Sequence, residues 1–555
     1  MPQASNHDVL LPDVPALGAV ETWDGVFRGE ARAALEAALP RFMMPRRWFA
    51  SNARTVRQTE ILETVPILPR AQLVLVRVSY TDGHAETYVL PVEWTGGDAA
   101  MTLAAKRPAS VIASLQAGGE HGILYDAVWD PAFCQALLDA IIEHREYAGT
   151  SGDVVASTAA VLQRLAGDAP QQLPPVLLGV EQSNTSVRFG DRLIMKLYRR
   201  LETGINPDQE IGQFLTDRCS FANTPPVAGV LEFRSHGADA ARAEPITMAL
   251  LQGFVPNRGD AWAYTLDALR DYFRAHAGSS LAAEDLALPK TPLLDLARHG
   301  VPAQAEQLIG PYLASARLLG RRTAELHLAL CSDPADPAFA PEPFTPEFQA
   351  YLHRSMRSLT DRMMQLLRDR FDALPAAGQA DAVRVLALEG EIAARFDTLL
   401  ARPISALRAR IHGDYHLGQV LYTGDDFMII DFEGEPARPL RERQMKRSPL
   451  QDVAGMLRSF HYAAYAAYFA EAGAGASTSA LEPLARYWHR WVSVAFLRTY
   501  LDVAEGAAFL PPSPDNLRLL LDAYLLEKAV YELGYELNNR PAWVRIPLQG
   551  ILQTI

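Results

Sequence analysis

Apolar positions along the chain predict an N-terminal part made largely of strands and a C-terminal part made almost entirely of helices. Residues 72–80 and 86–92 are rich in apolar residues and flank Asp82-Gly83, a pair typical of a tight β-hairpin. From about residue 260 onward, apolar residues recur three and four positions apart, as they do on one face of a helix. The clearest expected helices cover residues 130–146, 313–330, 351–374, 382–400 and 519–535.

A second group of short apolar segments predicts a small antiparallel sheet in the middle of the chain. A linker-like stretch at 167–175 precedes it, and a further apolar strand at 246–256 follows it. The expected strands cover residues 176–183, 186–189 and 193–198, with turns at Asn184-Thr185 and Gly190-Asp191.

Lys196 lies in the middle of the third expected strand, where a charged side chain requires a partner. Asn206 and Pro207 then predict the start of a helix, since they suit its N-cap and first position. Glu210 lies in the first turn of that helix. Kinases hold ATP phosphates with such a strand lysine paired to a helix glutamate. The alternative is a routine ion pair on a strand face.

The sequence Ile-His-Gly-Asp-Tyr-His-Leu-Gly-Gln at 411–419 has the spacing of a phosphotransfer site. Gln419 follows Asp414 by five residues, and Asp431 comes directly after the apolar run 427–430. Kinases need a carboxylate near the attacking hydroxyl, and an amide and a second carboxylate to hold magnesium, at similar spacings. The alternative is a histidine-rich turn before an ordinary hairpin.

Composition narrows the class of protein. A chain of 555 residues suggests two to four domains, and 49% hydrophobic with 21% charged residues is typical of a globular protein. The net charge of −13 disfavours binding to nucleic acid or to an anionic membrane. Three scattered cysteines offer no disulfide framework, and neither a signal peptide nor a run of ~20 apolar residues is present. We therefore expect a cytoplasmic protein.

Three further segments carry open alternatives. Arg46, Arg47 and Trp48 suit an anion or sugar site, or a solvated basic edge beside a core tryptophan. Asp452 could cap a helix, brace the 411–419 loop, or do both. Glu527, Tyr531 and Tyr535 share one helix face, which suits a sugar; the alternative is a half-buried face with a Lys528–Glu532 ion pair.

Taken together, these motifs resemble the bacterial maltokinases, within the aminoglycoside-phosphotransferase-like kinases. The resemblance covers residues 22–555, and its segments are Pro-Arg-Arg-Trp-Phe near residue 47, 181–186, 196–200, 206–210, 412–419, 431–433 and 527–543. It implies an α+β, bilobal eukaryotic-protein-kinase-like fold with an N-terminal α/β cap. The implied domains are a cap at 1–110, an N-lobe with an intermediate subdomain at 111–255, and a mostly helical C-lobe at 256–555.

The resemblance also implies a reaction: ATP-dependent phosphorylation of maltose at its anomeric hydroxyl, giving maltose 1-phosphate for α-glucan synthesis. Such domains also occur fused to trehalose synthase, which is thus an expected partner. A glucosamine or other aminosugar kinase, including an aminoglycoside kinase, is the first alternative. An additional carboxylate facing an ammonium group would favour it. A non-catalytic regulator that binds ATP or a sugar is the second.

The implied site residues fall into four groups. Asp414 is the expected proton acceptor, and it lies beside the sugar. Mg²⁺ would be held by Asp431, Gln419 and Glu433, where glutamine replaces the usual asparagine. The expected nucleotide-binding residues are Ser183, Asn184, Thr185, Ser186, Lys196, Glu210, Gln252, Gly253, Phe254 and Val255. The expected sugar-binding residues are Asp414, His416, Glu527, Tyr531, Arg540 and Trp543. The hairpin at 183–186 lacks the usual glycines, so small polar side chains would assist its backbone N–H groups.

Overall fold

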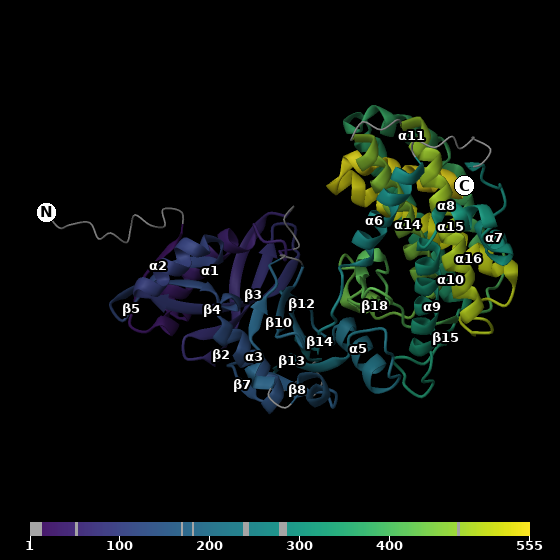
Figure 1. Cartoon of the computed structure of the whole chain (residues 1–555). Coiled ribbons are helices and arrows are strands. Elements are labelled where there is room, and N and C mark those ends of the chain that lie inside the picture. The colour runs from purple at the N-terminus through teal and green to yellow at the C-terminus, as the bar shows by residue number, and fades with distance from the viewer. Residues whose placement is uncertain are drawn as a thin grey trace. The chain divides into compact units, whose positions relative to one another are not determined.

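The computed structural model forms two compact units, coloured in sequence order in Figure 1. Unit 1 contains residues 1–216 and 225–255, and unit 2 contains residues 217–224 and 256–555. The domain limits expected from the sequence stay predictions. The structure describes residues 14–49, 54–167, 170–179, 183–236, 244–276, 286–473 and 478–555.

The first sheet of unit 1 has seven strands in the order β1-β5-β6-β4-β3-β2, with the short β12 beside β4. The predicted hairpin is confirmed: β3 and β4 are antiparallel and joined at Gly83, whose φ of 88° suits a residue without a side chain. Helix α1 packs Leu35 and Leu39 into the core of this sheet. The elements are β1 (Ala16–Val20), α1 (Gly29–Met43), β2 (Val56–Leu68), β3 (Ala71–Tyr80), β4 (Ala85–Gly96), α2 (Gly97–Lys106), β5 (Val111–Ala117), β6 (Glu120–Asp126) and β12 (Arg200–Leu201).

The second sheet of unit 1 has the order β7-β8-β13-β14-β11-β10-β9, with antiparallel pairing throughout. Its central strands are apolar on both faces, and α3 packs Phe133, Leu137 and Ile141 into the shared core. The elements are α3 (Pro131–Glu143), β7 (Glu146–Ala148), β8 (Gly152–Thr158), α4 (Leu162–Ala166), β9 (Pro175–Leu177), β10 (Thr185–Phe189), β11 (Leu193–Leu197), α5 (Pro207–Asp217), β13 (Val227–Ser235) and β14 (Ile246–Gly253).

Two strand predictions need correction. The expected strand at 176–183 is shorter, because β9 ends at Leu177, and Glu181 and Gln182 lie outside the described residues. The expected turn at Asn184-Thr185 is also displaced, because Thr185 already pairs with Leu197 as the first residue of β10.

Unit 2 is largely helical, as expected. Its helices are α6 (Ala261–His276), α7 (Leu293–His299), α8 (Ala303–Ile309), α9 (Tyr312–Leu330), α10 (Pro346–Asp369), α11 (Ala376–Ala387), α12 (Glu389–Asp397), α13 (Leu440–Arg443), α14 (Leu450–Gly473), α15 (Thr478–Val503), α16 (Pro514–Asn539) and α17 (Arg545–Thr554). Two short hairpins, β15 (Glu342–Pro343) with β16 (Leu407–Arg408) and β17 (Val420–Tyr422) with β18 (Phe427–Ile429), complete it.

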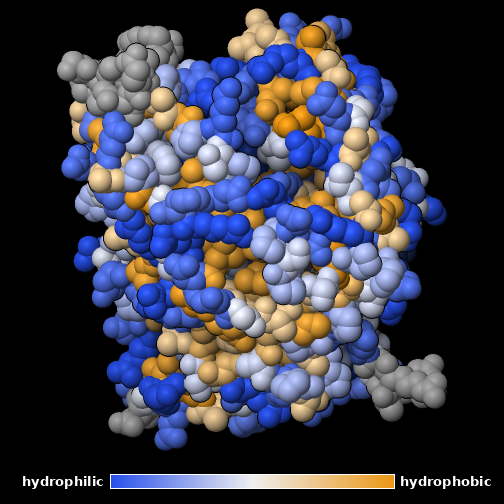
Figure 2. Space-filling view, turned by 90° about the vertical axis from the view of Figure 1, so that its right-hand side faces the viewer, coloured by the Kyte–Doolittle hydropathy of each residue, from blue (hydrophilic) through white to orange (hydrophobic). Residues whose placement is uncertain are grey.

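The helical periodicity of the sequence predicted which helix faces are buried better than it predicted where the helices end. Helix α10 buries Leu352, Met356 and Met364 on one face, as the periodicity predicts. On the molecule as a whole, hydrophilic side chains cover much of the surface shown in Figure 2. The prediction of one continuous helix over residues 382–400 is wrong. The chain instead forms α11 and α12, which are interrupted at Leu388. None of the helices among the described residues is both long enough and apolar enough to cross a membrane.

Candidate active site

In unit 1, Lys196 is held from two sides. It lies on β11 opposite Ser186 of β10 and Leu250 of β14, and its Nζ is 3.0 Å from Oδ2 of Asp208. The same Oδ2 accepts a hydrogen bond of 2.9 Å from the hydroxyl of Tyr198. Because Asp208 is almost fully buried, this carboxylate fixes the direction of the lysine side chain.

Asp208 was not among the site residues predicted from the sequence. The predicted start of α5 is confirmed, because the Asn206 side chain accepts a hydrogen bond of 2.9 Å from the backbone N–H of Asp208. The sequence did contain a signal for Asp208: it is a carboxylate at the second position of a helix whose N-cap, Asn206, is clear. The expected pairing of Lys196 with Glu210, which lies in the same first turn, stays a prediction.

The expected phosphate-binding and adenine-binding segments flank Lys196 in the same sheet. Thr185 accepts a hydrogen bond of 2.7 Å at its Oγ1 from Nε of Arg199. At the end of β14, the backbone N–H of Gly253 donates to Pro226, and that of Phe254 donates to Arg192. These two N–H groups are thus engaged within the protein. Roles in nucleotide binding for residues 183–186 and 252–255 stay predictions.

In unit 2, the loop at 412–414 is anchored by Asp452. Its two carboxylate oxygens accept the backbone N–H groups of His412 and Gly413 at 2.8 and 2.9 Å, and Nε2 of His327 lies 3.1 Å away. Burial alone would raise the pKa of Asp452, but His327 and the other partners hold it below its ordinary value. The predicted brace is confirmed. The predicted cap is wrong, because α14 begins at Leu450 and Asp452 lies inside its first turn.

The expected metal-binding residues of unit 2 lie directly after this loop. Nε2 of Gln419 donates to Oδ2 of Asp431 at 2.8 Å, so the two side chains meet. Asp431 has φ of 67°, a left-handed conformation that is unusual for a residue with a side chain and typical of functional positions. Amide and carboxylate oxygens are ligands that Mg²⁺ accepts, so this pair of side chains fits the ion. Glu433 lies two residues beyond Asp431.

A cavity of about 40 Å³ in unit 2 has Asp414 in its wall. Glu527 and Tyr531 of α16 also line it, together with Glu435, Arg438 and Lys528. The Lys528 ammonium is 3.5 Å from Oδ1 of Asp414. The alternative ion pair of Lys528 with Glu532 is therefore wrong, since Glu532 instead binds Arg458 at 2.6 Å.

The ionisable groups around this cavity shift the pKa values of one another. Burial raises the pKa of Glu527, while Arg438 and Arg447 partly oppose the rise. Burial would lower the pKa of Lys528, but Asp414, Glu532 and Glu435 raise it above its ordinary value. Burial also raises the pKa of Tyr531, and Glu435 adds to that effect. The ammonium of Lys528 therefore holds its proton more strongly than an ordinary lysine, and Glu527 takes up a proton more readily than an ordinary glutamate.

Of the remaining expected sugar-binding residues, His416 lies beside Asp414, whereas Arg540 and Trp543 are not among the residues that line this cavity. The Nδ1 atom of His416 accepts from Gly418, and its Nε2 is 3.9 Å from Oδ2 of Asp414. Arg540 donates to Glu536 at 2.7 Å and lies over the Trp543 ring at 4.7 Å. Arg540 is nine residues beyond Tyr531, which places it roughly 13 Å further along the helix axis. Sugar binding by Arg540 and Trp543 stays a prediction.

Comparison with known proteins shows the class. The model of the phosphotransferase enzyme family matches residues 175–491, and the model of the maltokinase N-terminal cap domain matches residues 42–130. The fold is thus α+β and eukaryotic-protein-kinase-like, with an N-terminal cap and a mostly helical C-lobe. Since the first match covers more than half of the chain, the chain belongs to the phosphotransferase enzyme family.

Curated relatives and solved structures extend the likeness over most of the chain. A glucosamine kinase of Streptacidiphilus jiangxiensis is 24% identical over 74% of this chain and 80% of its own length. One of Mycolicibacterium smegmatis is 26% identical over 66% of this chain and 76% of its own. A structure of glucosamine kinase with glucosamine, ADP and inorganic phosphate superposes with a TM-score of 0.58 at 19% identity, covering 93% of this chain and 97% of that one. The structural likeness concerns the fold.

Proposed function

We propose that the protein transfers the γ-phosphoryl group of ATP to a hydroxyl group of a sugar. The observation that carries the proposal is the position of Asp414, on a loop held by Asp452 and in the wall of a cavity shared with Glu527 and Tyr531. In this reaction Asp414 accepts the proton of the attacking hydroxyl. Lys196, directed by Asp208, neutralises charge on the α- and β-phosphates.

Magnesium would be held by the side chains of Gln419 and Asp431, with Glu433 assisting. When bound, the ion neutralises charge that builds up on the phosphoryl oxygens. The hydrogen bond between Gln419 and Asp431 keeps the two side chains together, and the left-handed backbone of Asp431 sets the direction of its carboxylate. The chain thereby supplies orientation, which is the main contribution that loose phosphoryl transfer requires.

The favoured acceptor is an aminosugar such as glucosamine. Glu527 and Glu435 add two carboxylates to the cavity wall beyond Asp414, and a protonated amino group is the ligand that such groups stabilise. Glu435 is already paired with Arg438 at 2.8 Å, so Glu527 is the better candidate to contact an ammonium group. The relatives that extend over most of the chain are named glucosamine kinases, which supports the same choice.

Maltose is the second candidate, with phosphorylation at its anomeric hydroxyl to give maltose 1-phosphate. It is supported by the match of residues 42–130 to the maltokinase cap domain. A role in α-glucan and trehalose metabolism, association with trehalose synthase and a cytoplasmic location belong to this proposal.

The deciding experiment measures magnesium-dependent ADP release from ATP with glucosamine, maltose, glucose and trehalose as acceptors. We expect the highest kcat/KM with glucosamine. A higher value with maltose would transfer the assignment to the second candidate. ATP binding without turnover on any of the sugars would contradict the proposal in favour of a regulator without catalytic activity.

A further inference from the structure

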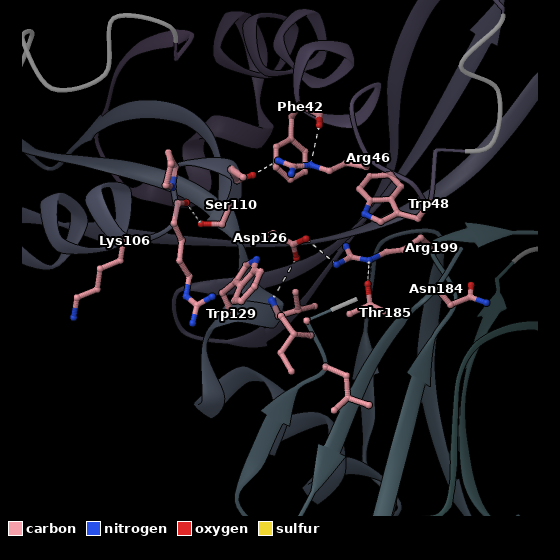
Figure 3. A pocket seen from close by; sticks show the side chains of 17 residues that line it. Phe42, Arg46, Trp48, Lys106, Ser110, Asp126, Trp129, Asn184, Thr185 and Arg199 are labelled. Atoms are coloured by element: carbon pink, nitrogen blue, oxygen red, sulfur yellow. Dashed lines mark hydrogen bonds and ion pairs between the residues drawn. The ribbon is translucent and has the colours of Figure 1, made fainter. Parts of the chain in front are cut away.

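Unit 1 contains a second cavity, of about 300 Å³, that the proposed reaction does not use (Figure 3). Its wall combines two parts of the chain: residues within 42–130, the cap domain match, and residues within 175–199 of the phosphotransferase match. Its volume lies at the lower end of the range of small-molecule sites, which suits a ligand the size of a monosaccharide phosphate.

The cavity is positively charged in a strongly acidic protein. Arg46, Lys106, Arg107 and Arg199 line it, while Asp126 is the one carboxylate among its described lining residues. The whole chain carries a net charge of −13, so such a concentration of cations is not explained by composition. An excess of cations around a concave site favours an anionic ligand.

Arg199 gives the cavity a buried hydrogen-bond donor. Its side chain is 1% exposed; Nε donates to Thr185 and Nη2 donates to Asp126, both at 2.7 Å. Its Nη1 is buried and makes no hydrogen bond within the described part of the chain. Figure 3 shows the guanidinium group facing the cavity between Asp126 and Thr185. An unpaired buried donor destabilises the protein, and a hydrogen bond to a ligand oxygen would remove that cost.

The rest of the wall suits a carbohydrate. Trp129 and Leu178 provide apolar surface, and Leu178 is 36% exposed although it is a leucine. The guanidinium carbon of Arg107 lies 4.0 Å from the centre of the Trp129 ring, which brings a cation to the edge of this apolar wall. The indole of Trp48 faces the same space in Figure 3. Aromatic surface beside cationic donors matches a ligand that has both C–H faces and a phosphate.

We propose that this cavity is a binding site for a small phosphorylated sugar. The phosphate would be bound by Arg199, while the exposed Lys106 and Arg107 add positive charge to the wall, and the sugar ring would lie against Trp129 and Leu178. Arg199 is also bonded to Thr185, and it follows Lys196 by three residues, so the ligand would contact the strands that carry the expected ATP-binding groups.

Isothermal titration calorimetry of the full chain with glucose 6-phosphate, glucose and inorganic phosphate tests the proposal. We expect glucose 6-phosphate to bind at least ~10-fold more tightly than either of the other two, since charged hydrogen bonds and apolar contact are then both made. The double variant Lys106→Glu, Arg107→Glu should weaken this binding at least ~10-fold, because two cations become anions. Both residues are exposed, so their replacement leaves the core intact.

The control is Arg77→Glu, a charge reversal at an exposed position of β3 in the same unit, outside the cavity wall. It should bind glucose 6-phosphate as the parent does. Equal binding by the parent and the double variant would overturn the proposal, because the ligand would then occupy another site. Inorganic phosphate binding as tightly as glucose 6-phosphate would overturn the sugar assignment. Since no turnover is measured, the result is independent of the proposed kinase activity.

Discussion

The carboxylate of Asp414 lies between Lys528 and His416, at distances longer than those of a close ion pair. Lys528 lies 3.5 Å from one oxygen and His416 lies 3.9 Å from the other. The carboxylate is thereby kept in the cavity wall as an acceptor for a hydroxyl proton. Asp414→Asn retains the shape and removes the acceptor, so we expect kcat to fall at least ~100-fold.

The matched control for this variant is Asp425→Asn, at an exposed position of the following hairpin. ADP release gives kcat, and calorimetric titration with ATP checks that nucleotide binding is retained. Turnover near the parent rate in Asp414→Asn would remove Asp414 from the proposed mechanism.

Glu527 decides between the two candidate acceptors. If it binds an ammonium group, Glu527→Gln should raise KM for glucosamine at least ~10-fold, because a charged hydrogen bond is lost, and leave KM for maltose nearly unchanged. An equal effect on both sugars would show that Glu527 does not contact the amino group. The control is Glu505→Gln, at an exposed position after α15.

The raised pKa of Glu527 predicts a pH dependence of the same contact. The carboxylate binds an ammonium group only when ionised, and burial makes it take up a proton at a higher pH than an ordinary glutamate does. As the pH falls, KM for glucosamine should therefore begin to rise at a pH above about 4.3, the pKa of an ordinary glutamate. In Glu527→Gln this part of the pH profile should be absent.

At the scale of elements, the first turns of α14 hold the backbone of the loop at 412–414. Asp452→Asn leaves one carbonyl oxygen where two carboxylate oxygens accepted N–H groups, so one buried donor loses its partner. We expect a loss of roughly 1–3 kcal/mol in the free energy of unfolding and a lower kcat. Because the folded-state pKa of Asp452 is depressed, its contribution is present above the unfolded pKa near 3.9 and lost as the pH falls below it. Thermal unfolding between pH 3 and 7 measures both effects, and an unchanged midpoint would contradict the brace.

Gly455 brings the same helix against the loop backbone. A Cβ atom at this position would lie 2.6 Å from the carbonyl oxygen of Tyr415, and backbone cannot move aside as a flexible side chain can. Gly455→Ala should therefore displace the loop and lower kcat at least ~10-fold, although alanine favours the helix itself. Gly390→Ala in α12, where a Cβ meets no atom within 4 Å, is the control. A parent-like kcat in Gly455→Ala would show that the loop tolerates the shift.

What the sequence could predict follows from the range of the interactions involved. The β3–β4 hairpin, the start of α5 and the buried face of α10 depend on local turn residues, capping and periodicity, and all three were predicted. Asp208 and Arg199 were not, because their importance depends on partners that folding brings to them. The break at Leu388 was missed because α11 and α12 keep nearly the same apolar period on either side of it.

At the scale of the whole molecule, the local groups of charge differ from the net charge of the chain. The chain is acidic, yet its groups for binding anions gather in unit 1, around Lys196 and around the cavity of Arg199. The carboxylates proposed for proton transfer and for an ammonium ligand lie in unit 2, in the cavity wall that contains Asp414 and Glu527. Under the proposed function, unit 1 binds anionic groups and unit 2 binds a cationic group, a difference that the net charge of the chain does not show.

If the 300 Å³ cavity of unit 1 binds a sugar phosphate, the hydrogen bonds of Arg199 would couple that cavity to ATP binding. A sugar phosphate that engages Nη1 would fix the guanidinium and, through Nε, Thr185 at the start of β10. Ordering this strand beforehand reduces the entropy that ATP binding must overcome. We therefore expect glucose 6-phosphate to lower KM for ATP at least ~2-fold at saturating acceptor, with kcat little changed, a modest coupling for linked sites. Steady-state ADP release should show this effect in the parent and in Arg77→Glu, but not in Lys106→Glu, Arg107→Glu. An unchanged KM in the parent despite measured binding would show that the cavity is not coupled to the nucleotide.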